Sequence, residues 1–583
     1  MLNVIQVEQL IAEKSPQFLQ QNPMIRRPTI GLLRWLFHES EVNRFLEQQQ
    51  QLRGFDFVDR VLDYFDFRYQ VSQSDRSNIP ASGRTLVVAN HPLGALDGLA
   101  LLRLIGEIRQ DVKIIANDML MKFDPLQRLL LPVDNLAGGS PRQQLKRIKQ
   151  SLLRDEAVII FPAGEVSRMS PGGIRDGAWS SSYLKLAKKT NSPLLPVHVG
   201  GRNSWLFYLS SMLYRPLSSL LLAHEMFRQR RRQIPIRVGQ PIPIQELDQL
   251  PLGNSEKNKL VKRHLYRLAK GRKPLLKTEK TVAHPQDRKA LKQELKQAVH
   301  LGATADNKQI LLFDYREDSA VMRELGRLRE IAFRQVGEGT GQKRDLDQHD
   351  SNYRHLILWD EEELELVGAY RIGETNRWIN RSDRDKIYST ELFDYSEEMA
   401  PYFARGIELG RSFVQPKYWG KRSLDYLWYG IGAYLRQHPE IRYMFGPVSL
   451  SNSYPSLAKD MLVYFYRLYF ADPQQLAMAY SPHSIEEEHL DLIIPLFSGD
   501  NYEQDFKELK QQLKHLGCTV PTLYKQYSEV CEEGGVRFLD FGVDADFGYC
   551  IDGLVLVDLE KLKPTKRNRY LAEQESTQTT ENL

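Results

Sequence analysis

The chain has 583 residues, of which 42% are hydrophobic and 26% are charged, and its formal net charge is +5. Such a length exceeds what one hydrophobic core can serve, so we expect at least two domains. The composition is that of a globular protein and excludes a largely disordered chain or one built of membrane spans. Three cysteines without metal-ligand spacing predict no disulfide framework and indicate a reducing cytoplasm.

Residues 1–75 are predicted to form a helical leader. Apolar residues recur at helical spacing near the start of this segment and again around Trp35. The first turns lack the charged start and apolar core of a secretory signal. Such a leader would either pack beside a catalytic domain or lie on a bilayer.

Residues 87–98, with the sequence VVANHPLGALDG, carry the first candidate site. The apolar residues at its start predict a buried strand that ends near His91 and Pro92. Asp97 follows six positions after His91. Its carboxylate could accept the imidazole N–H and leave the other ring nitrogen ready to take a proton from a hydroxyl group. The alternative is a capped turn that contains an ordinary hydrogen-bonded histidine.

A second motif begins where another predicted strand, residues 157–161, runs into the sequence PAGEVSR. A strand followed by a glycine-containing turn and a cation suits a phosphate group. Together with a later proline-containing strand, these motifs resemble the glycerolipid acyltransferase family over about residues 80–240. The chain departs from the family pattern at Ala163, which stands where the family has glutamate. The resemblance implies that His91 and Asp97 are catalytic and that substrate is bound by Phe161, Pro162, Gly164, Glu165 and Arg168.

Alternating strands and helices predict an α/β domain over residues 76–275. Within it, residues 205–232 begin with aromatic and leucine residues and end in a run of arginines. Interruptions at Arg215 and His224 make this segment too broken for a transmembrane helix, and an interfacial helix on anionic lipid fits better. A buried helix with a solvated basic end is the alternative.

Residues 276–305 are predicted to be a basic linker between the domains. The basic residues that precede it, between positions 257 and 273, indicate acidic partners, either anionic lipid or acyl carrier protein. Nucleic acid is not expected as a partner. The chain shows no base-reading motif, and its basic residues do not alternate with stacking aromatic residues.

The second half, residues 306–565, contains a strand, a long helix, an acidic segment and further strands in an order that resembles the GNAT superfamily. Within that superfamily the chain is similar to acyl-homoserine-lactone synthases and to the ornithine and glycine lipid N-acyltransferases. The resemblance implies an α+β fold, acyl carrier protein thioesters as co-substrates and no bound cofactor. Residue by residue, it carries over to Arg329, Asp347, Asp350, Arg371, Glu408 and Arg411.

These residue types suit the acylation of an amine. An amino acid arrives as an ammonium and must lose a proton before it attacks a thioester, and we predict Glu408 as the base. Arg371 and Arg411 would bind a substrate carboxylate or organise the acids, and no metal site is expected. The alternative is an ordinary buried ion-pair network. The basic residues within positions 416–423 would suit the phosphopantetheine arm of a carrier protein.

Taken together, the two halves resemble the fused ornithine lipid synthases of bacteria. The resemblance implies that the second half acylates the α-amine of an amino acid, with ornithine favoured, from 3-hydroxyacyl carrier protein. The first half would then esterify this lyso-ornithine lipid from a second acyl carrier protein, at the cytoplasmic face of the inner membrane or in the cytoplasm. For the side-chain ammonium of ornithine, the candidate carboxylates are Asp345, Asp347 and Asp350.

Three alternatives stay open. The chain could be a glycine lipid synthase, or a single-activity lysophospholipid acyltransferase whose second half only binds carrier protein. It could also be a membrane-tethered binding module without activity. The polar tail at residues 566–583 is predicted to be disordered in every case.

Overall fold

The computed structural model describes residues 6–14, 16–19, 22–116, 118–121, 123–132, 141–170, 173–213, 215–378 and 380–572. The chain divides into two compact units, Met1–His284 and Pro285–Leu583. The division lies inside the predicted linker, but much of that segment is structured, since α15 (Arg288–Leu295) and β10 (Val299–Ala303) belong to the second unit. The predicted disordered tail begins within α23 (Pro564–Tyr570), and residues 573–583 lie outside the described residues.

The leader of the first unit is helical, as predicted. It contains α1 (Val7–Lys14), α2 (Pro16–Leu19), α3 (Pro23–Leu36), α4 (Glu39–Gln48), α5 (Phe55–Tyr64) and α6 (Gln73–Arg76). The leader is also part of the domain, because its strand β1 (Arg68–Gln70) pairs in parallel with β9 (Gln233–Val238). Helix α5 buries Phe57, Val58 and Leu62, whose spacing places them on one helical face.

A seven-stranded sheet in the order β1-β9-β8-β2-β5-β3-β4 forms the centre of the first unit. From β8 to β4 neighbouring strands are parallel, and β9 is antiparallel to β8. All five residues of β2 are buried, as expected for a strand with helices on both faces. The remaining strands of this sheet are β2 (Thr85–Ala89), β3 (Val112–Ala116), β4 (Leu130–Pro132), β5 (Ala157–Ile160) and β8 (Leu194–Val199).

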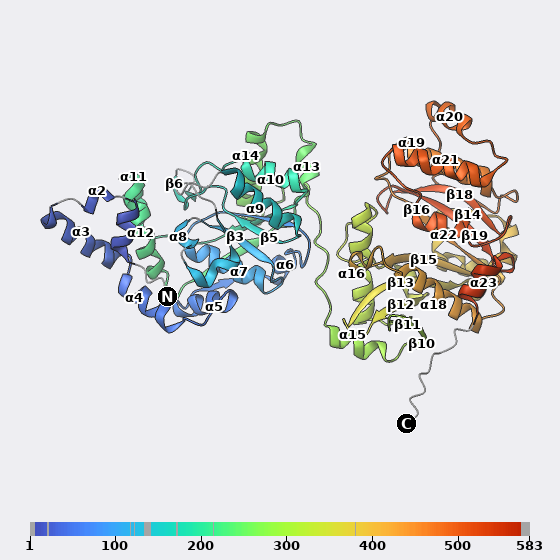
Figure 1. The fold of residues 1–583 in the computed structure, drawn as a ribbon, viewed down its shortest axis with the longest axis horizontal. Coiled ribbons are helices and arrows are strands. Elements are labelled where there is room, and N and C mark those ends of the chain that lie inside the picture. The colour runs from blue at the N-terminus through green and yellow to red at the C-terminus, as the bar shows by residue number, and fades with distance from the viewer. Residues whose placement is uncertain are drawn as a thin grey trace, which may run out of the picture. The chain divides into compact units, whose positions relative to one another are not determined.

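Helices cover both faces of this sheet (Figure 1), and successive residues of β2 pack on opposite layers of them. Leu86 and Val88 lie against α9 (Pro141–Leu153), α10 (Ser182–Thr190) and α14 (Asn254–Leu268). Val87 and Ala89 lie against α5 and α7 (Ala95–Gly106). The predicted α/β fold of this half is confirmed. The smaller elements are α8 (Asp118–Met121), α13 (Ile244–Asp248), the 3₁₀ helix η1 (Asp124–Leu129) and the hairpin of β6 (Arg168–Ser170) and β7 (Gly173–Arg175).

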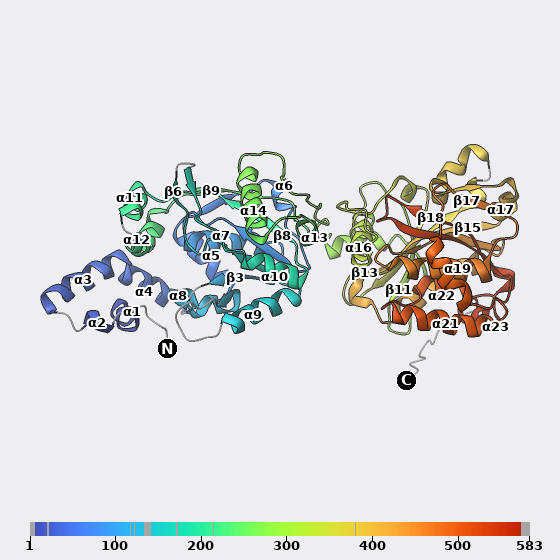
Figure 2. The same cartoon turned by 90° about the horizontal axis from the view of Figure 1, so that it is seen from above.

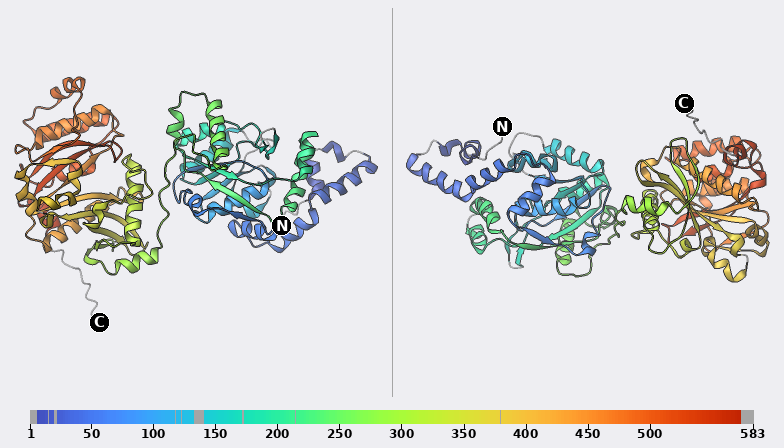
Figure 3. Two further views of the ribbon diagram at one scale, coloured as in Figure 1. Left: turned by 180° about the vertical axis from the view of Figure 1, so that it is seen from behind. Right: turned by 90° about the horizontal axis from the view of Figure 1, so that it is seen from below.

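The segment predicted as an interfacial helix forms two helices, α11 (Trp205–Leu213) and α12 (Arg215–Arg228). Helix α12 contacts α3 of the leader, and Figure 2 and Figure 3 show these helices gathered at one end of the first unit. Across the described parts of the chain, every helix is too short or too polar to span a bilayer.

The second unit contains an eight-stranded sheet in the order β10-β11-β12-β13-β15-β16-β19-β18. Neighbouring strands are antiparallel except for the parallel pair β15 and β16. The predicted mixed fold of this half is confirmed. The strands are β11 (Gln309–Asp314), β12 (Arg354–Asp360), β13 (Glu365–Glu374), β15 (Gly406–Val414), β16 (Tyr443–Leu450), β18 (Val536–Asp544) and β19 (Cys550–Asp558).

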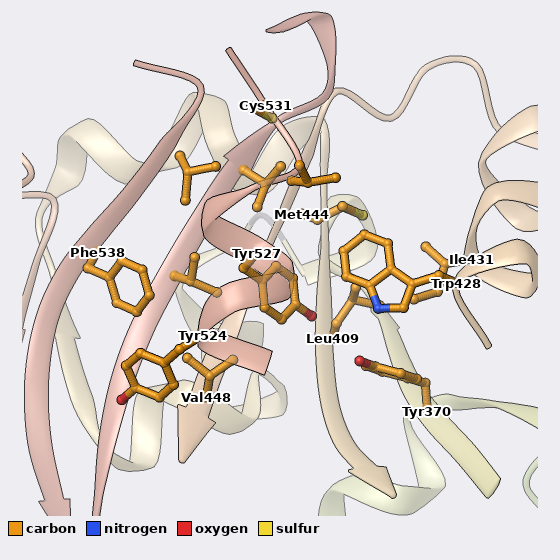
Figure 4. Packing of buried hydrophobic residues seen from close by; sticks show 14 of the residues in the cluster. Tyr370, Leu409, Trp428, Ile431, Met444, Val448, Tyr524, Tyr527, Cys531 and Phe538 are labelled. Atoms are coloured by element: carbon orange, nitrogen blue, oxygen red, sulfur yellow. The ribbon is translucent and has the colours of Figure 1, made fainter. Parts of the chain in front are cut away.

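Helices cover both faces of this sheet. Helix α16 (Ala320–Val336) packs on one face, and α18 (Ser423–Gln437), α19 (Ser456–Phe470), α21 (Tyr502–His515) and α22 (Thr522–Ser528) pack on the other. Figure 4 shows the aromatic part of this second layer, where Tyr370 of β13, Trp428 of α18 and Tyr527 of α22 meet. The shorter elements are α17 (Ala400–Ala404), α20 (Glu487–Ile493), β14 (Phe393–Tyr395) and β17 (Ala477–Ala479).

The two parallel strands of the second unit separate after a short contact. β15 and β16 pair only from Gly406 to Glu408 with Tyr443 to Phe445 among the residues described. Beyond that point β15 contains a bulge opposite β13, and Arg411 takes the left-handed backbone conformation with φ 48°. Bulges bend a strand and re-aim its side chains. The divergence opens a cavity between the two strands.

Candidate active sites

The predicted catalytic pair of the first unit comes together at the carboxyl end of β2. His91 follows the strand, and Asp97 lies in the first turn of α7. The buried Asp97 Oδ2 accepts hydrogen bonds from the backbone N–H groups of Leu93 at 2.7 Å and Gly94 at 3.2 Å. His91 Nδ1 lies 3.2 Å from the same oxygen. The turn requires glycine at position 94, where φ is 101°.

This contact orients the imidazole without forming a well-aligned hydrogen bond. Neither His91 Nδ1 nor Asp97 Oδ1 has a hydrogen-bond partner of good geometry among the described residues. Catalytic hydrogen bonds are commonly loose before substrate binds. When the neutral imidazole carries its proton on Nδ1, the atom that lies beside Asp97, Nε2 is the basic nitrogen. The His91 side chain is 18% exposed, so a hydroxyl group can reach it.

The second motif packs against this histidine. β5 neighbours β2 in parallel, with Val88 opposite Ile160, so the residues after both strands meet at one edge of the sheet. The ring of Phe161 stacks on His91 with a centroid separation of 4.1 Å. The backbone N–H of Ser167 donates to the His91 carbonyl oxygen at 2.7 Å. The motif therefore shapes the walls around the imidazole.

The other residues predicted to bind substrate lie in the same turn. Pro162 accepts a backbone hydrogen bond from Ser180, and Gly164 has the left-handed φ of 65°. Arg168 forms an ion pair with Glu165 at 3.0 Å, so its charge is partly balanced within the motif. The segment thus presents an ion pair, whereas we predicted a cation that would bind a phosphate group.

Sequence reasoning missed two residues that hold the histidine in place. Asp176 Oδ1 accepts hydrogen bonds from the His91 backbone N–H at 3.2 Å and from the Ser167 hydroxyl at 2.5 Å. The Asn90 side chain exchanges two hydrogen bonds with the backbone of Val199 and so fixes β2 to β8. The position of Asn90 directly before the histidine was a usable signal, whereas nothing near Asp176 in the sequence marked it.

In the second unit, the predicted arginines and aspartates form one buried network. Arg329 Nη1 lies 2.7 Å from Asp350, and Arg371 Nη1 lies 2.6 Å from Asp347 and 3.5 Å from Asp350. Arg411 reaches Asp347 at 3.3 Å. Although burial by itself would raise the pKa of Asp350, the neighbouring Arg329 and Arg371 hold that pKa well below its usual range.

The same network occupies the carboxylates that we proposed for a substrate ammonium. Asp345 lies 3.2 Å from Arg411, so Asp345, Asp347 and Asp350 all pair with arginines of the protein. Arg329 and Arg371 are fully buried. Of the three arginines, Arg411 is the one that lines the cavity. The arginines therefore chiefly organise the acids, which is one of the two roles predicted for them.

Glu408 does not lie where a base for a substrate in the cavity would be expected. Its carboxylate accepts hydrogen bonds from the Tyr353 hydroxyl, from Tyr388 N at 3.0 Å and from Ser389 N at 2.8 Å. It is buried and absent from the cavity wall. Tyr388 does line the cavity, and its hydroxyl accepts a hydrogen bond from Arg411 at 3.1 Å. Glu408 thus holds the backbone of Tyr388, and its role as the base stays a prediction.

The cavity between β15 and β16 has a volume of about 670 Å³. One part is apolar and is lined by residues such as Phe333, Val414, Leu424 and Leu523. The polar part contains Glu338, Tyr388, Arg411, Ser449 and Asp552. Sequence reasoning missed Glu338, Tyr388 and Asp552, since each is a single residue outside the motifs that the sequence analysis used.

Part of the predicted pantetheine-binding segment also lines this cavity. Trp419 and Lys421 border it, and Trp419 is exposed. Lys417 instead pairs with Glu365, and Arg422 pairs with Asp425 at 3.3 Å. Of the three basic residues in the segment, Lys421 is therefore the one positioned to meet a ligand.

The comparisons with known proteins match each unit to a family of acyl-transferring enzymes. The family described as "Acyltransferase" matches residues 9–272, and the family described as "Acetyltransferase (GNAT) domain" matches residues 328–429. The folds and sites thus define an acyltransferase with two different transfer domains. The chain is 32% identical over 303 residues, 50% of its length and 89% of the relative's, to the glycine N(alpha)-acyltransferase of Bacteroides thetaiotaomicron.

A second relative comes from the same bacterium. The chain is 32% identical over 254 residues, 42% of its length and 91% of the relative's, to the lyso-glycine lipid O-acyltransferase of B. thetaiotaomicron. It is 28% identical over 267 residues, 43% of its length and 92% of the relative's, to the L-ornithine N(alpha)-acyltransferase of Rhodobacter capsulatus. The chain therefore belongs to the family of these acyltransferases and joins both kinds of domain in one polypeptide.

Proposed function

We propose that this chain is a bifunctional aminolipid synthase, in which the second unit acylates an amino acid on nitrogen and the first unit esterifies the product. One observation carries the proposal. Two separate proteins of B. thetaiotaomicron, a glycine N(alpha)-acyltransferase and a lyso-glycine lipid O-acyltransferase, each match a stretch about as long as one unit. Fusion of the two activities would pass a lyso-lipid from one site to the other.

For N-acylation, the cavity of the second unit has apolar lining residues that suit one substrate and polar lining residues that suit the other. Its apolar wall suits the acyl chain of a 3-hydroxyacyl thioester. Arg411 faces the polar part and suits the carboxylate of an amino acid. The amine attacks the thioester carbonyl carbon, the C–N bond forms, the C–S bond breaks, and the thiolate leaves and takes up a proton.

We propose glycine as the amino acid ahead of ornithine, which the sequence resemblance favoured. The full-length N-acyltransferase match for glycine has the higher identity, 32% against 28%. Ornithine stays the second candidate, because two acids, Glu338 and Asp552, line the polar part of the cavity. One of these acids would bind the α-ammonium of the amino acid, and the other would bind the side-chain ammonium of ornithine.

For O-acylation, His91 takes the proton from the 3-hydroxyl group of the lyso-lipid. The alkoxide oxygen attacks the carbonyl carbon of a second acyl thioester, the C–O bond forms and the C–S bond breaks. The imidazolium then returns its proton to the leaving thiolate. Asp97 stabilises the imidazolium, since its buried carboxylate lies 3.2 Å from Nδ1.

Acyl carrier protein is the proposed acyl donor at both sites, with no bound cofactor. Carrier proteins of this kind are acidic, and basic surface residues would receive them. The first unit carries basic side chains along α14 and the segment after it, and Lys421 borders the cavity of the second unit. These basic residues support the proposal of an acidic carrier protein as the donor.

We also propose that the first unit lies on an anionic lipid surface at the cytoplasmic face of the inner membrane. Helices α3 and α11 expose large apolar side chains, with Trp35 61% and Trp205 65% exposed. Both helices adjoin α12, so the exposed residues belong to one end of the unit. Arginines at positions 26, 27 and 34 accompany them. Aromatic and basic residues together are typical of interfacial helices.

An assay with purified full-length protein tests the proposed function. Labelled glycine or ornithine is mixed first with 3-hydroxyacyl carrier protein and then with a second acyl carrier protein. The proposal predicts a singly acylated amide in the first step and a doubly acylated lipid after the second. If the protein instead acylates lysophosphatidic acid and leaves both amino acids unchanged, the single-activity alternative is correct.

A further inference from the structure

Three acids of the second unit form a separate group outside the arginine–aspartate network. Glu338 follows α16, Asp544 ends β18 and Asp552 lies in β19. All three are buried, and each interacts electrostatically with the same Cys550 and so belongs to one cluster. Two of them, Glu338 and Asp552, face the cavity. Asp552 thus lies at the cavity within reach of the charges of Asp544 and Glu338.

Asp552 differs from its neighbours in what its carboxylate contacts. Asp544 Oδ1 accepts backbone hydrogen bonds from Asp546 at 2.9 Å and Phe547 at 3.1 Å. Glu338 accepts the hydroxyl hydrogen of Ser449 at 2.9 Å. The Asp552 residue is 5% exposed and lines the cavity, yet its carboxylate has no hydrogen-bond or ion-pair partner in the described ranges.

Because Asp552 lines the cavity and makes no ion pair with any residue that the structure describes, its carboxylate is available to a cationic group bound there. A substrate ammonium would satisfy it. The sheet also fixes its place, since Asp552 lies opposite Ser449 in the β16–β19 ladder and both residues line the same wall. Arg411 lies across the diverging strands, so a cation and an acid flank the space for an amino acid.

The surroundings of Asp552 also adjust its proton affinity. Burial, followed by the negative charges of Asp544 and Glu338, raises the pKa of Asp552 to about 8, and Arg411 opposes this effect. The hydroxyl groups of Tyr388 and Tyr524 and the thiol of Cys550 are further titratable groups that interact with it. A base whose pKa is close to the working pH transfers protons efficiently in both directions.

From this geometry we infer that Asp552 is the general base of N-acylation. The inference rests on the proposed function and assigns the step that we had predicted for Glu408. The α-ammonium gives one proton to the Asp552 carboxylate, and the free amine attacks the thioester carbonyl carbon. As the tetrahedral intermediate collapses, the second nitrogen proton goes to the departing thiolate. Asp552 then releases its proton to water.

The test measures the pH dependence of N-acylation by full-length protein carrying Asp552→Asn. We expect kcat to fall about 10²- to 10⁴-fold near neutral pH, because asparagine keeps the shape and cannot accept the proton. In the parent protein the rate should rise with pH near pH 8 as Asp552 loses its proton, and this limb of the pH–rate profile should disappear in the variant. The residual activity should rise towards high pH as the free amine becomes abundant, a recovery that a folding defect would not produce.

Asp544→Asn is the matched control, since it removes an equally buried charge that does not face the cavity. It should keep the limb of the pH–rate profile but move it to lower pH, because the negative charge of Asp544 is one cause of the raised pKa of Asp552. If Asp552→Asn retains both the limb and a near-normal rate while the parent protein forms the amide, the inference is wrong and the proposed function stands. If the parent protein acylates no amine at all, the proposed function and the inference fail together.

Discussion

His91 and Asp97 form a pair because the local sequence forces both into one turn. The strand ends before His91, Gly94 allows the sharp reversal with φ 101°, and Asp97 receives two backbone N–H groups at the start of α7. A carboxylate in this place is fixed by the backbone and needs no other side chain to orient it. The histidine is therefore oriented before any substrate binds.

Asp97→Asn tests this orientation at the residue scale. We expect O-acylation to fall about 10²- to 10⁴-fold, because an amide cannot stabilise the imidazolium that forms on His91. N-acylation should be unchanged, so the singly acylated amide accumulates and is measured by chromatography of the products. Asp155→Asn, at an exposed carboxylate of the same unit, is the control. Equal O-acylation by the parent and Asp97→Asn would contradict the account.

The substitution Glu408→Gln tests whether Glu408 orients neighbouring residues or acts as the base of N-acylation. The amide would place an N–H donor against the N–H groups of Tyr388 and Ser389, so we expect a loss of about 1 to 3 kcal/mol in stability. N-acylation should fall through a raised KM while its pH–rate limb near 8 stays, because Asp552 is untouched. Thermal unfolding and a pH series measure both effects. Loss of that limb in Glu408→Gln would restore Glu408 as the base.

At the scale of elements, the approach of β16 to β15 sets the shape of the N-acylation cavity. Gly446 of β16 has φ 154°, and a Cβ there would meet the Leu409 carbonyl oxygen at 2.0 Å. The strands therefore touch at Gly446 and diverge beyond it. Because the Leu409 oxygen is backbone, no side-chain movement can relieve such a contact.

Gly446→Ala should therefore destabilise the second unit by about 2 to 4 kcal/mol and impair N-acylation more than O-acylation. Gly410→Ala is the control, since a Cβ on that β15 residue meets nothing within 4 Å. Calorimetry of the full chain and the two separate assays report the effects. Similar unfolding temperatures for the two variants would show that the strands do not touch at Gly446.

Much of the site in the first unit was predictable from the sequence, since its motifs lie directly after apolar strands. The pairing of His91 with Asp97 is local, and the packing of Phe161 follows from two adjacent parallel strands. The role of Glu408 was not predictable. On a regular strand Glu408 and Arg411 would face opposite sides, whereas the bulge lets both reach Tyr388.

The cavity acids could not be found because they depend on long-range register. Asp552 is a lone acid within an apolar strand, and only its pairing with Ser449 places it beside Arg411.

The domain boundary was approximate for a related reason. The basic segment after residue 276 looks like a linker, although Leu291 and Leu295 bury one face of α15 against α16.

At the scale of the whole molecule, the exposed apolar end of the first unit predicts membrane binding. Trp35→Ser combined with Trp205→Ser should reduce sedimentation with anionic vesicles about tenfold or more, because both indoles are lost from the interface. Leu492→Ser, at an exposed residue of the second unit, is the control and should bind normally. Equal binding of the parent and the tryptophan variant would exclude this surface as the contact.

The most direct measurement is mass spectrometry of lipids from a bacterium that lacks aminolipids and expresses this chain. The account predicts a new doubly acylated amino acid, whose mass identifies glycine or ornithine. His91→Ala should stop at the singly acylated amide, and Asp552→Asn should strongly reduce both products. If the parent chain yields no aminolipid and the phospholipid composition changes instead, the bifunctional account is wrong.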